Sequence, residues 1–229
     1  MSIQIQYTDK ISAKDGVKAV LYGEFGVGKT PLLASAPSPI IFSAEEGLLS
    51  LRKMRVAYID VSNYKDLVEA VTWLNKSNEA RQFQTPCLDS MSEIAEVIFA
   101  EERRKNNDPR KYVPAARDQM FELVRHFRDM KGKNVVFVGK QAVEQNELGQ
   151  RRAVPAMSND KVQQAVPYFF DLVLHLFIGN YFDANGVAQQ YRGIHTKQGY
   201  PEYQARDRSG NLDLVEYPDL AAIFKKAVS

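Results

Sequence analysis

A glycine-rich run that ends in a lysine and a threonine constrains this chain more than any other feature. The run consists of Gly23, Glu24, Phe25, Gly26, Val27, Gly28, Lys29 and Thr30, and it fits the pattern G-x-x-x-x-G-K-[ST]. Residues 17–22 before it are mostly apolar and indicate a strand, and a helix is expected from Leu32 onward. A glycine-rich turn between a strand and a helix directs backbone N–H groups toward an anion. The sequence therefore predicts a phosphate-binding loop, and the alternative is a chance match in a glycine turn.

The last residues of this run have separate expected roles. In such loops the lysine, here Lys29, contacts the β- and γ-phosphates, and the hydroxyl of Thr30 binds Mg²⁺. Pro31 follows directly and lacks the N–H that could face an α-phosphate. As an early helical residue it costs no intrahelical hydrogen bond. We therefore expect a bound nucleoside triphosphate with Mg²⁺, held less tightly than usual.

Composition excludes several other classes of protein. With 229 residues, 45% hydrophobic and 25% charged, the chain suits one globular α/β domain, which we place at 16–229. The single cysteine, Cys87, excludes an internal disulfide and a cysteine zinc site. No apolar run approaches membrane-spanning length, so no membrane partner is expected. The net charge of +2 is too small to indicate nucleic acid by itself. His126, His175 and His195 lack metal-ligand spacing, which favours packing or surface positions.

Apolar segments of strand length alternate with helical patterns, which predicts a mostly parallel twisted sheet flanked by helices. Strands are expected at 17–22, 39–43, 56–61, 84–89, 134–138 and 170–178. Helices are expected at 64–74, 93–104 and 115–130, and Asn63 is expected to cap the first of these three. A late antiparallel pair is expected at 187–196 and 202–206, and a last helix from Pro218 to Val228. The leader, residues 1–15, alternates in polarity; it is either an edge strand of this sheet or a strand added to a neighbouring subunit.

Three polar side chains follow predicted strands, where a parallel sheet would place them beside the phosphate loop. Asp89 ends one strand and is predicted to hold Mg²⁺; the alternative is a helix cap. Glu45 follows another strand and could activate the attacking water, or it could belong to a solvated acidic turn. Gln141 follows a third strand; it could hydrogen-bond the γ-phosphate, or it could be an ordinary polar residue at a strand end.

Two basic regions suggest a second ligand. One contains Arg103, Arg104, Lys105, Arg110 and Lys111. The other lies in a segment without clear periodicity, about 142–167, and contains Arg151, Arg152 and Lys161. A loop of this length inside a compact domain is usually functional. Clustered positive charge near an aromatic residue suits a nucleic-acid backbone with a stacked base. The alternative is solvated charge at a helix C-terminus.

In combination these motifs resemble a known family. The order GEFGVGKT, SAEEG, LDS and VFVGKQ, each after a predicted strand, resembles the RecA-like P-loop ATPase core. More narrowly, it is similar to the phage-encoded Sak-four type recombination ATPases, the phage nucleotide-binding protein group. The stretch YQARDRSG near the end resembles the basic hairpin of that group, so the resemblance covers about residues 16–226.

The resemblance implies further roles. Lys29, Glu45 and Gln141 would form a hydrolysis site for ATP with Mg²⁺, Glu45 being the catalytic glutamate and Gln141 the coupling residue. Arg206 and Arg208 would reach a neighbour's nucleotide across a subunit interface; the alternative is surface charge on a hairpin. It also implies the loop at 142–165 and the region 103–112 as sites for single-stranded DNA, assembly into a homo-oligomeric filament or ring, and a single-strand-binding protein as partner. The single cysteine and the lack of a signal pattern at the start of the sequence predict a cytoplasmic location, which is the host cytoplasm for a phage protein.

The sequence leaves three functions open. The first is a DNA-stimulated ATPase that acts as a recombinase or annealing mediator. The second is a P-loop small-molecule kinase acting on a nucleoside or nucleotide, with residues 103–111 as a lid. The third is a non-catalytic, nucleotide-gated assembly module. Two departures from the family pattern, Pro31 and Pro86, bear on turnover. Pro86 removes a ladder donor from a predicted strand, which predicts a bulge or an unpaired position there.

Overall fold

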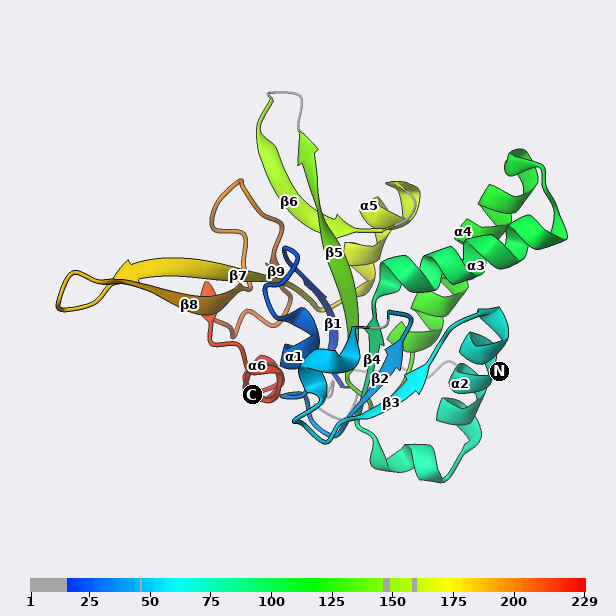
Figure 1. The fold of residues 1–229 in the computed structure, drawn as a ribbon, viewed down its shortest axis with the longest axis horizontal. Helices are drawn as coiled ribbons and strands as arrows, with labels where there is room; N and C mark the ends of the chain where they lie inside the picture. The colour runs from blue at the N-terminus through cyan, green and yellow to red at the C-terminus, as the bar shows by residue number, and fades with distance from the viewer. Residues whose placement is uncertain (1–15, 46, 146–148, 158–159) are drawn as a thin grey trace, which may run out of the picture.

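The computed structural model describes residues 16–45, 47–145, 149–157 and 160–229. Within this part, ten strands form one sheet in the order β10-β8-β7-β1-β5-β4-β2-β3, with β6 paired to β5 and β9 paired to β7 (Figure 1). The strands are β1 (Lys18–Tyr22), β2 (Pro39–Ser43), β3 (Ala57–Asp60), β4 (Thr85–Asp89), β5 (Val135–Gln145), β6 (Arg151–Ala156), β7 (Leu172–Phe182), β8 (Ala188–His195), β9 (Arg206–Asp207) and β10 (Val215–Glu216). The predicted leader, residues 1–15, lies outside the described residues.

The six central strands, from β7 to β3, are parallel, and β8 and β10 extend the sheet in antiparallel pairing. This confirms the predicted fold class. Helices cover both faces: α1 (Lys29–Leu33), α2 (Tyr64–Lys76), α3 (Met91–Lys105), α4 (Pro109–Arg128), α5 (Asp160–Phe169) and α6 (Leu220–Ala227), with short 3-10 turns η3 (Leu48–Leu51) and η4 (Glu79–Gln82). Within the described part of the chain, no helix has the length and apolar character needed to cross a membrane.

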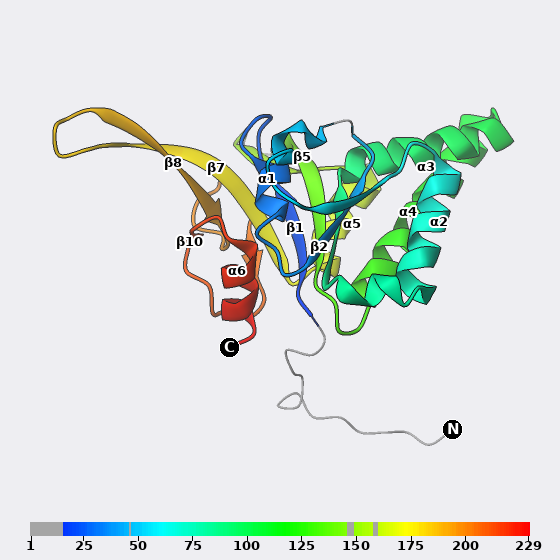
Figure 2. The same ribbon diagram turned by 60° about the horizontal axis from the view of Figure 1, so that its bottom comes forward.

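The two faces of the sheet bury separate cores, because successive residues of a strand point to opposite sides. In β5, Val135 and Phe137 pack with α2, α3, α4 and α5. Their neighbours Val136 and Val138 pack on the other face with α1 and α6. Figure 2 shows α6 and α1 on one side of the sheet and α2 to α4 on the other. This packing fixes the strand edge from which the polar side chains project.

Several helix boundaries follow from their caps. The side chain of Asn63 accepts a hydrogen bond from the Asp66 amide, as predicted for a helix that begins at Tyr64. Helix α4 begins at Pro109, earlier than expected, because Asp108 caps it and Pro109 occupies the first turn. The last helix begins at Leu220 instead of Pro218, since Asp219 is the residue that caps it.

The prediction of an irregular loop over 142–167 was wrong. Strand β5 continues to Gln145 and pairs with β6 as an antiparallel hairpin, and α5 follows from Asp160. The expected pairing of 187–196 with 202–206 was also wrong. Strand β8 pairs with β7 and β10, whereas β9 pairs with the first residues of β7.

Of the two outcomes predicted at Pro86, a bulge or an unpaired position, no bulge is found in the ladder between β2 and β4, where Ile40 and Pro86 are register partners in an unbroken run. The parallel ladder between β4 and β5 contains only the pairs Cys87–Val136 and Leu88–Phe137. The ladder to β5 thus begins just after the proline, so the strand accommodates the missing donor by a shorter pairing.

Candidate functional site

The glycine-rich run forms the turn between β1 and α1. Gly26 and Gly28 have φ values of 76° and 104°, a left-handed backbone that glycine adopts without steric cost. The ammonium of Lys29 donates to the carbonyl oxygens of Gly23 and Glu24, at 2.8 and 2.9 Å. The lysine thus lies over the turn, which is where the sequence pattern predicts a bound phosphate.

Pro31 is the third residue of α1. The first intrahelical hydrogen bond of this helix runs from the Leu32 amide to the Gly28 carbonyl, at 3.2 Å. A first-turn residue has no intrahelical acceptor for its amide, so the proline disturbs no helical hydrogen bond, as the sequence predicted.

Thr30 and Asp89 meet beside this turn. The threonine hydroxyl donates to the Asp89 carboxylate at 2.7 Å, and Asp89 is buried at the end of β4. Burial raises the pKa of Asp89, and the hydrogen bond from Thr30 opposes that rise. Burial lowers the pKa of Lys29, while the nearby carboxylates of Asp89 and Glu45 act in the opposite direction. The structure therefore brings together the two residues predicted to hold a metal.

This pair suits Mg²⁺ by the chemistry of its donors. Magnesium takes hard oxygen ligands and in nucleotide sites uses one or two protein groups together with phosphate oxygens and water. A hydroxyl and a carboxylate supply that kind of donor set. Among the described residues, no group of three or more His, Cys, Asp or Glu side chains is arranged to hold a metal ion. A metal would therefore be held by Thr30 and Asp89 with the help of the nucleotide.

Glu45 lies near Lys29 and Asp89, at the end of β2. Its carboxylate accepts a hydrogen bond of 2.6 Å from the hydroxyl of Ser90, and the Lys140 ammonium lies 3.8 Å from the same oxygen. Lys140 also forms an ion pair with Glu93. These contacts hold the Glu45 side chain toward the phosphate loop, the position required of a group that orients water.

A cavity of about 870 Å³ connects these side chains. Residues from the phosphate loop, from the ends of β2 and β4 and from β5 line it: Gly23, Glu24, Phe25, Gly26, Gly28, Lys29, Thr30, Pro31, Glu45, Gly47, Ser50, Asp89, Ser90, Lys140, Gln141 and Val143. Gln141 also contacts His175, with 3.1 Å between the amide oxygen and Nε2. All three polar residues predicted at strand ends, Glu45, Asp89 and Gln141, therefore lie on one cavity with Lys29.

Sequence reasoning missed Arg192, which lies against the phosphate loop from β8. Its Nε donates to the carbonyl oxygen of Val27 at 2.8 Å, and a side chain at Gly28 would lie 3.3 Å from that nitrogen. A second cavity of about 700 Å³ lies beside it, lined in part by Tyr191 and Tyr217. No local pattern marks Arg192, because the contact joins residues 165 positions apart in the chain.

Arg206 and Arg208 lie away from this cavity. Arg206 pairs with Val173 near the amino end of β7, whereas the phosphate loop follows the carboxyl end of β1. Arg208 donates to the carbonyl oxygen of Tyr168 and lies 3.8 Å from the Asp171 carboxylate. Neither residue lines the cavity of its own chain, so their predicted role at a neighbour's nucleotide stays a prediction.

The first basic cluster lies at the connection between α3 and α4. Arg104 is 3.1 Å from Glu101, and Lys105 is 2.7 Å from Glu102. Arg110 is 3.2 Å from Asp108. Figure 1 shows this connection at the end of the molecule farthest from the β7–β8 hairpin. Arg103 and Lys111 are exposed in the same region. Acidic neighbours therefore reduce much of the positive charge that the sequence suggested here.

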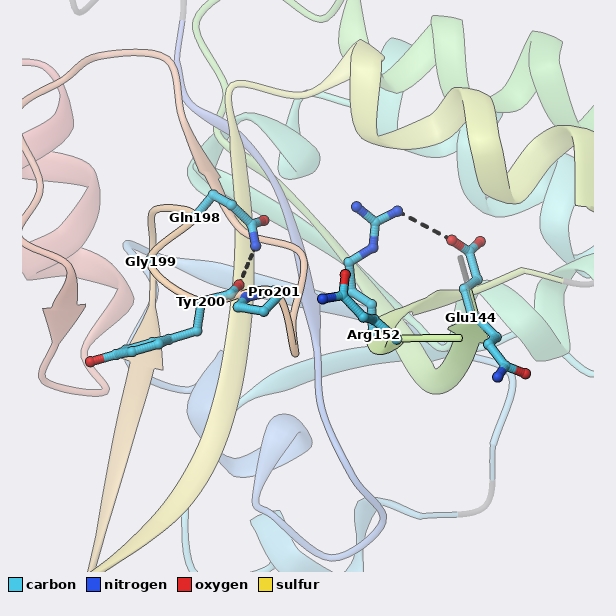
Figure 3. Close-up of a pocket in the computed structure, with 8 residues that line it drawn as sticks. Glu144, Arg152, Gln198, Gly199, Tyr200 and Pro201 are labelled. Carbon is cyan, nitrogen blue, oxygen red and sulfur yellow. Dashed lines mark hydrogen bonds and ion pairs between the residues drawn. The ribbon is translucent and has the colours of Figure 1, made fainter. Parts of the chain in front are cut away.

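The second basic region lies on the β5–β6 hairpin and on α5. Arg152 on β6 is 3.3 Å from Glu144 on β5, and Arg151 and Lys161 are exposed. Glu144 and Arg152 line a cavity of about 560 Å³ together with the segment Gln198–Pro201. Figure 3 shows Arg152 and Tyr200 on opposite sides of it. Arginine, glutamine and exposed tyrosine thus gather at a cavity distinct from that of the phosphate loop.

These features define a nucleotide-binding P-loop ATPase with an α/β fold. The chain belongs to the AAA domain family, whose model matches residues 15–209. The family implies nucleotide binding, and usually Mg²⁺, in agreement with the donors that line the loop cavity. A comparison with curated proteins finds no match to the chain.

Proposed function

We propose that this AAA-domain protein is a RecA-like ATPase of the phage Sak-four type, which couples ATP binding and hydrolysis to the binding of single-stranded DNA during recombination or annealing. The observation that carries the proposal is the course of β5. Gln141 on this strand lines the phosphate-loop cavity, and Glu144, three residues further on, lines the cavity that contains Arg152. One continuous strand therefore joins the two sites.

In the proposed reaction, the backbone of the loop and Lys29 bind the phosphates of ATP, and Thr30 and Asp89 hold Mg²⁺. When bound, the metal would neutralise part of the negative charge on the phosphates of ATP. Glu45 accepts a proton from the attacking water, and Ser90 keeps its carboxylate in place through the 2.6 Å hydrogen bond. Gln141 contacts the γ-phosphate by a hydrogen bond and responds when that group leaves.

Single-stranded DNA is proposed to bind along the β5–β6 hairpin and the cavity beside it. Arg151 and Arg152 supply charge for the phosphates, and exposed Tyr200 supplies a ring for a base. Lys161 on α5 is expected to add to this surface. The cluster of Arg103, Arg104, Lys105, Arg110 and Lys111 is expected to contribute less, because Arg104, Lys105 and Arg110 form ion pairs with acidic neighbours.

We further propose a homo-oligomer, a filament or a ring, that interacts with a single-strand-binding protein. Arg206 and Arg208 lie too far from their own phosphate loop's cavity to line it, so an interface is where they would act on a nucleotide. Sedimentation with and without ATP tests the assembly. A monomer as the only species in both conditions would contradict it.

The DNA proposal is tested with a fluorescent oligonucleotide. Replacing Arg151 and Arg152 with alanine should weaken binding in the presence of ATP and make its dependence on salt shallower by about one or two ion equivalents. The control replaces Lys76 and Arg81, which lie before the amino end of β4, with alanine and should leave binding unchanged. Equal affinity and equal salt dependence for all three proteins would contradict the proposal, and transfer of phosphate to a nucleoside would favour a kinase.

A further inference from the structure

Three side chains, from β5, β7 and β8, form a hydrogen-bonded path that begins at the phosphate-loop cavity. Tyr22 on β1 is the register partner of His175 on β7, and His175 is the register partner of His195 on β8. The amide oxygen of Gln141 lies 3.1 Å from Nε2 of His175. Nδ1 of His175 lies 3.1 Å from Nδ1 of His195. A continuous hydrogen-bonded path therefore begins at the cavity and ends on β8.

Both histidines are neutral at neutral pH. Burial, together with the neighbouring His195, lowers the pKa of His175 to about 4, and burial also lowers the pKa of His195. A neutral imidazole has one donor and one acceptor nitrogen. Two imidazoles joined through Nδ1 therefore need opposite tautomers, one donating and one accepting.

The path consequently has two internally consistent arrangements. In the first, His195 donates from Nδ1 to His175, His175 donates from Nε2 to the Gln141 oxygen, and the Gln141 amide N–H groups are left to face the cavity. In the second, the Gln141 amide is flipped by about 180°, so that its N–H donates to Nε2 of His175 and its oxygen faces the cavity. His175 then donates from Nδ1 to His195.

Conversion between the two arrangements conserves charge and protons. Nε2 of His195 gains a proton from water, the proton on Nδ1 of His195 passes to Nδ1 of His175, and Nε2 of His175 releases its proton to water. Only N–H bonds of the two rings and O–H bonds of water are made or broken. The Gln141 amide turns at the same time, because an amide oxygen cannot donate.

The far end of the path is connected through Tyr203 and Gln198 to the cavity that Glu144 and Arg152 line. The His195 ring is stacked on Phe177, with centroids 4.0 Å apart, and on Tyr203, with centroids 3.9 Å apart. Both rings are nearly parallel to it, so they occupy opposite faces. Glu202 and Tyr203 come directly after the segment Gln198–Pro201 in the sequence. The Ala153 amide donates to the Glu202 carbonyl at 2.7 Å. The neighbour of Ala153 on β6 is Arg152, which lines that cavity.

We propose that His175 and His195 are positioning residues whose tautomers report the terminal phosphate of the nucleotide to the segment 198–203 beside Arg152. An anion at the cavity favours amide N–H groups over an amide oxygen, so a γ-phosphate selects the first arrangement. Loss of the γ-phosphate removes that preference. This inference rests on the proposed contact between Gln141 and the γ-phosphate.

The direct test is nitrogen NMR of protein labelled with ¹⁵N in its histidines, because protonated and unprotonated ring nitrogens resonate far apart. The sample is compared with Mg²⁺-ADP and with Mg²⁺-ADP plus beryllium fluoride, a γ-phosphate mimic. With the mimic, His175 should be protonated at Nε2 and His195 at Nδ1; with ADP, both signals should move toward the other tautomer. His126 on α4, which contacts Asn75, is an internal control and should not respond.

The His195→Phe variant provides a functional test. Phenylalanine keeps a ring between Phe177 and Tyr203 but cannot donate to His175. The variant should bind ADP as the wild type does, while the preference of DNA binding for the mimic over ADP falls by about tenfold. Identical nitrogen shifts for ADP and the mimic, with both shown to be bound, would overturn the relay alone. Moving shifts without any DNA binding would support the relay and contradict the DNA proposal.

Discussion

The Thr30 hydroxyl donates a 2.7 Å hydrogen bond to the buried carboxylate of Asp89, across 59 positions of sequence. This contact joins the first turn of α1 to the end of β4 and places a hydroxyl and a carboxylate oxygen on one cavity with Lys29. A carboxylate that is buried with one hydroxyl donor is poorly compensated in charge. The pair is therefore arranged to gain from a cation, which accounts for its expected role with Mg²⁺.

Replacing Asp89 with asparagine should lower ATP turnover by about a hundredfold and raise the Mg²⁺ concentration needed for half-maximal activity, since the amide keeps an oxygen for Thr30 but loses the charge. Stability should not fall, because a buried charge is removed. Titration of Mg²⁺ in a phosphate-release assay measures the effect, with exposed Asp118→Asn as control. Unchanged Mg²⁺ dependence would remove Asp89 from the metal site.

Replacing Glu45 with glutamine should lower turnover by about 10²- to 10³-fold while ATP still binds, since a glutamine can accept from Ser90 but cannot take a proton from water. Single-turnover hydrolysis and nucleotide affinity are measured on the same preparation. The Ser90→Ala variant removes only the hydrogen bond and should show a smaller loss. Equal turnover in Glu45→Gln and wild type would exclude Glu45 as the base.

The hydrogen bond between Arg192 and Val27 predicts that β8 supports the phosphate loop. The Arg192→Ala variant should bind nucleotide about five- to tenfold more weakly, the effect of losing about 1 kcal/mol. Arg192→Lys should be intermediate, because lysine restores the charge without the planar fork. Calorimetry or a fluorescent nucleotide provides the affinities, with Arg81→Ala as control. Wild-type affinity in Arg192→Ala would show that the loop does not depend on this contact.

Burial of His175 predicts a dependence of stability on pH. Its pKa is lowered from 6.5 to about 4 in the folded chain, so the unfolded chain binds more protons between these values. Stability is therefore full above about pH 6.5 and falls as the pH decreases toward 4. Since the ring is not fully buried, we expect the unfolding free energy to fall by roughly 1–2 kcal/mol through this group. Urea unfolding of wild type and His175→Gln at several pH values measures the difference, which should be constant if the histidine has no such role.

The sequence predicted the core of the fold because its signals there are local. The run from Gly23 to Thr30 indicated the turn between β1 and α1, and the segment 39–43 matches β2 at both ends. Asp89 and Gln141 were found because each comes at the end of an apolar segment, in β4 and in β5. In a parallel sheet, such positions share an edge.

The β5–β6 hairpin was missed for a physical reason. Beyond Gly139 the ribbon is mostly exposed or half-buried, with Val154 and Pro155 as its buried residues, so the sequence has no sustained alternating pattern to detect. Arg192 and the pair His175–His195 were missed because their partners lie on strands far apart in sequence. Hydrogen bonds and stacking between strands leave no local spacing in the sequence.

The most direct test of the central claim is the rate of ATP hydrolysis with and without single-stranded DNA, in wild type and in Lys29→Ala. We predict turnover that rises several-fold with DNA in the wild type and is lost in the variant, because the lysine neutralises the transferred phosphate. Exposed Lys65→Ala is the matched control. Turnover that does not respond to DNA, or that persists in Lys29→Ala, would contradict the proposal that this phosphate loop drives a DNA-coupled ATPase.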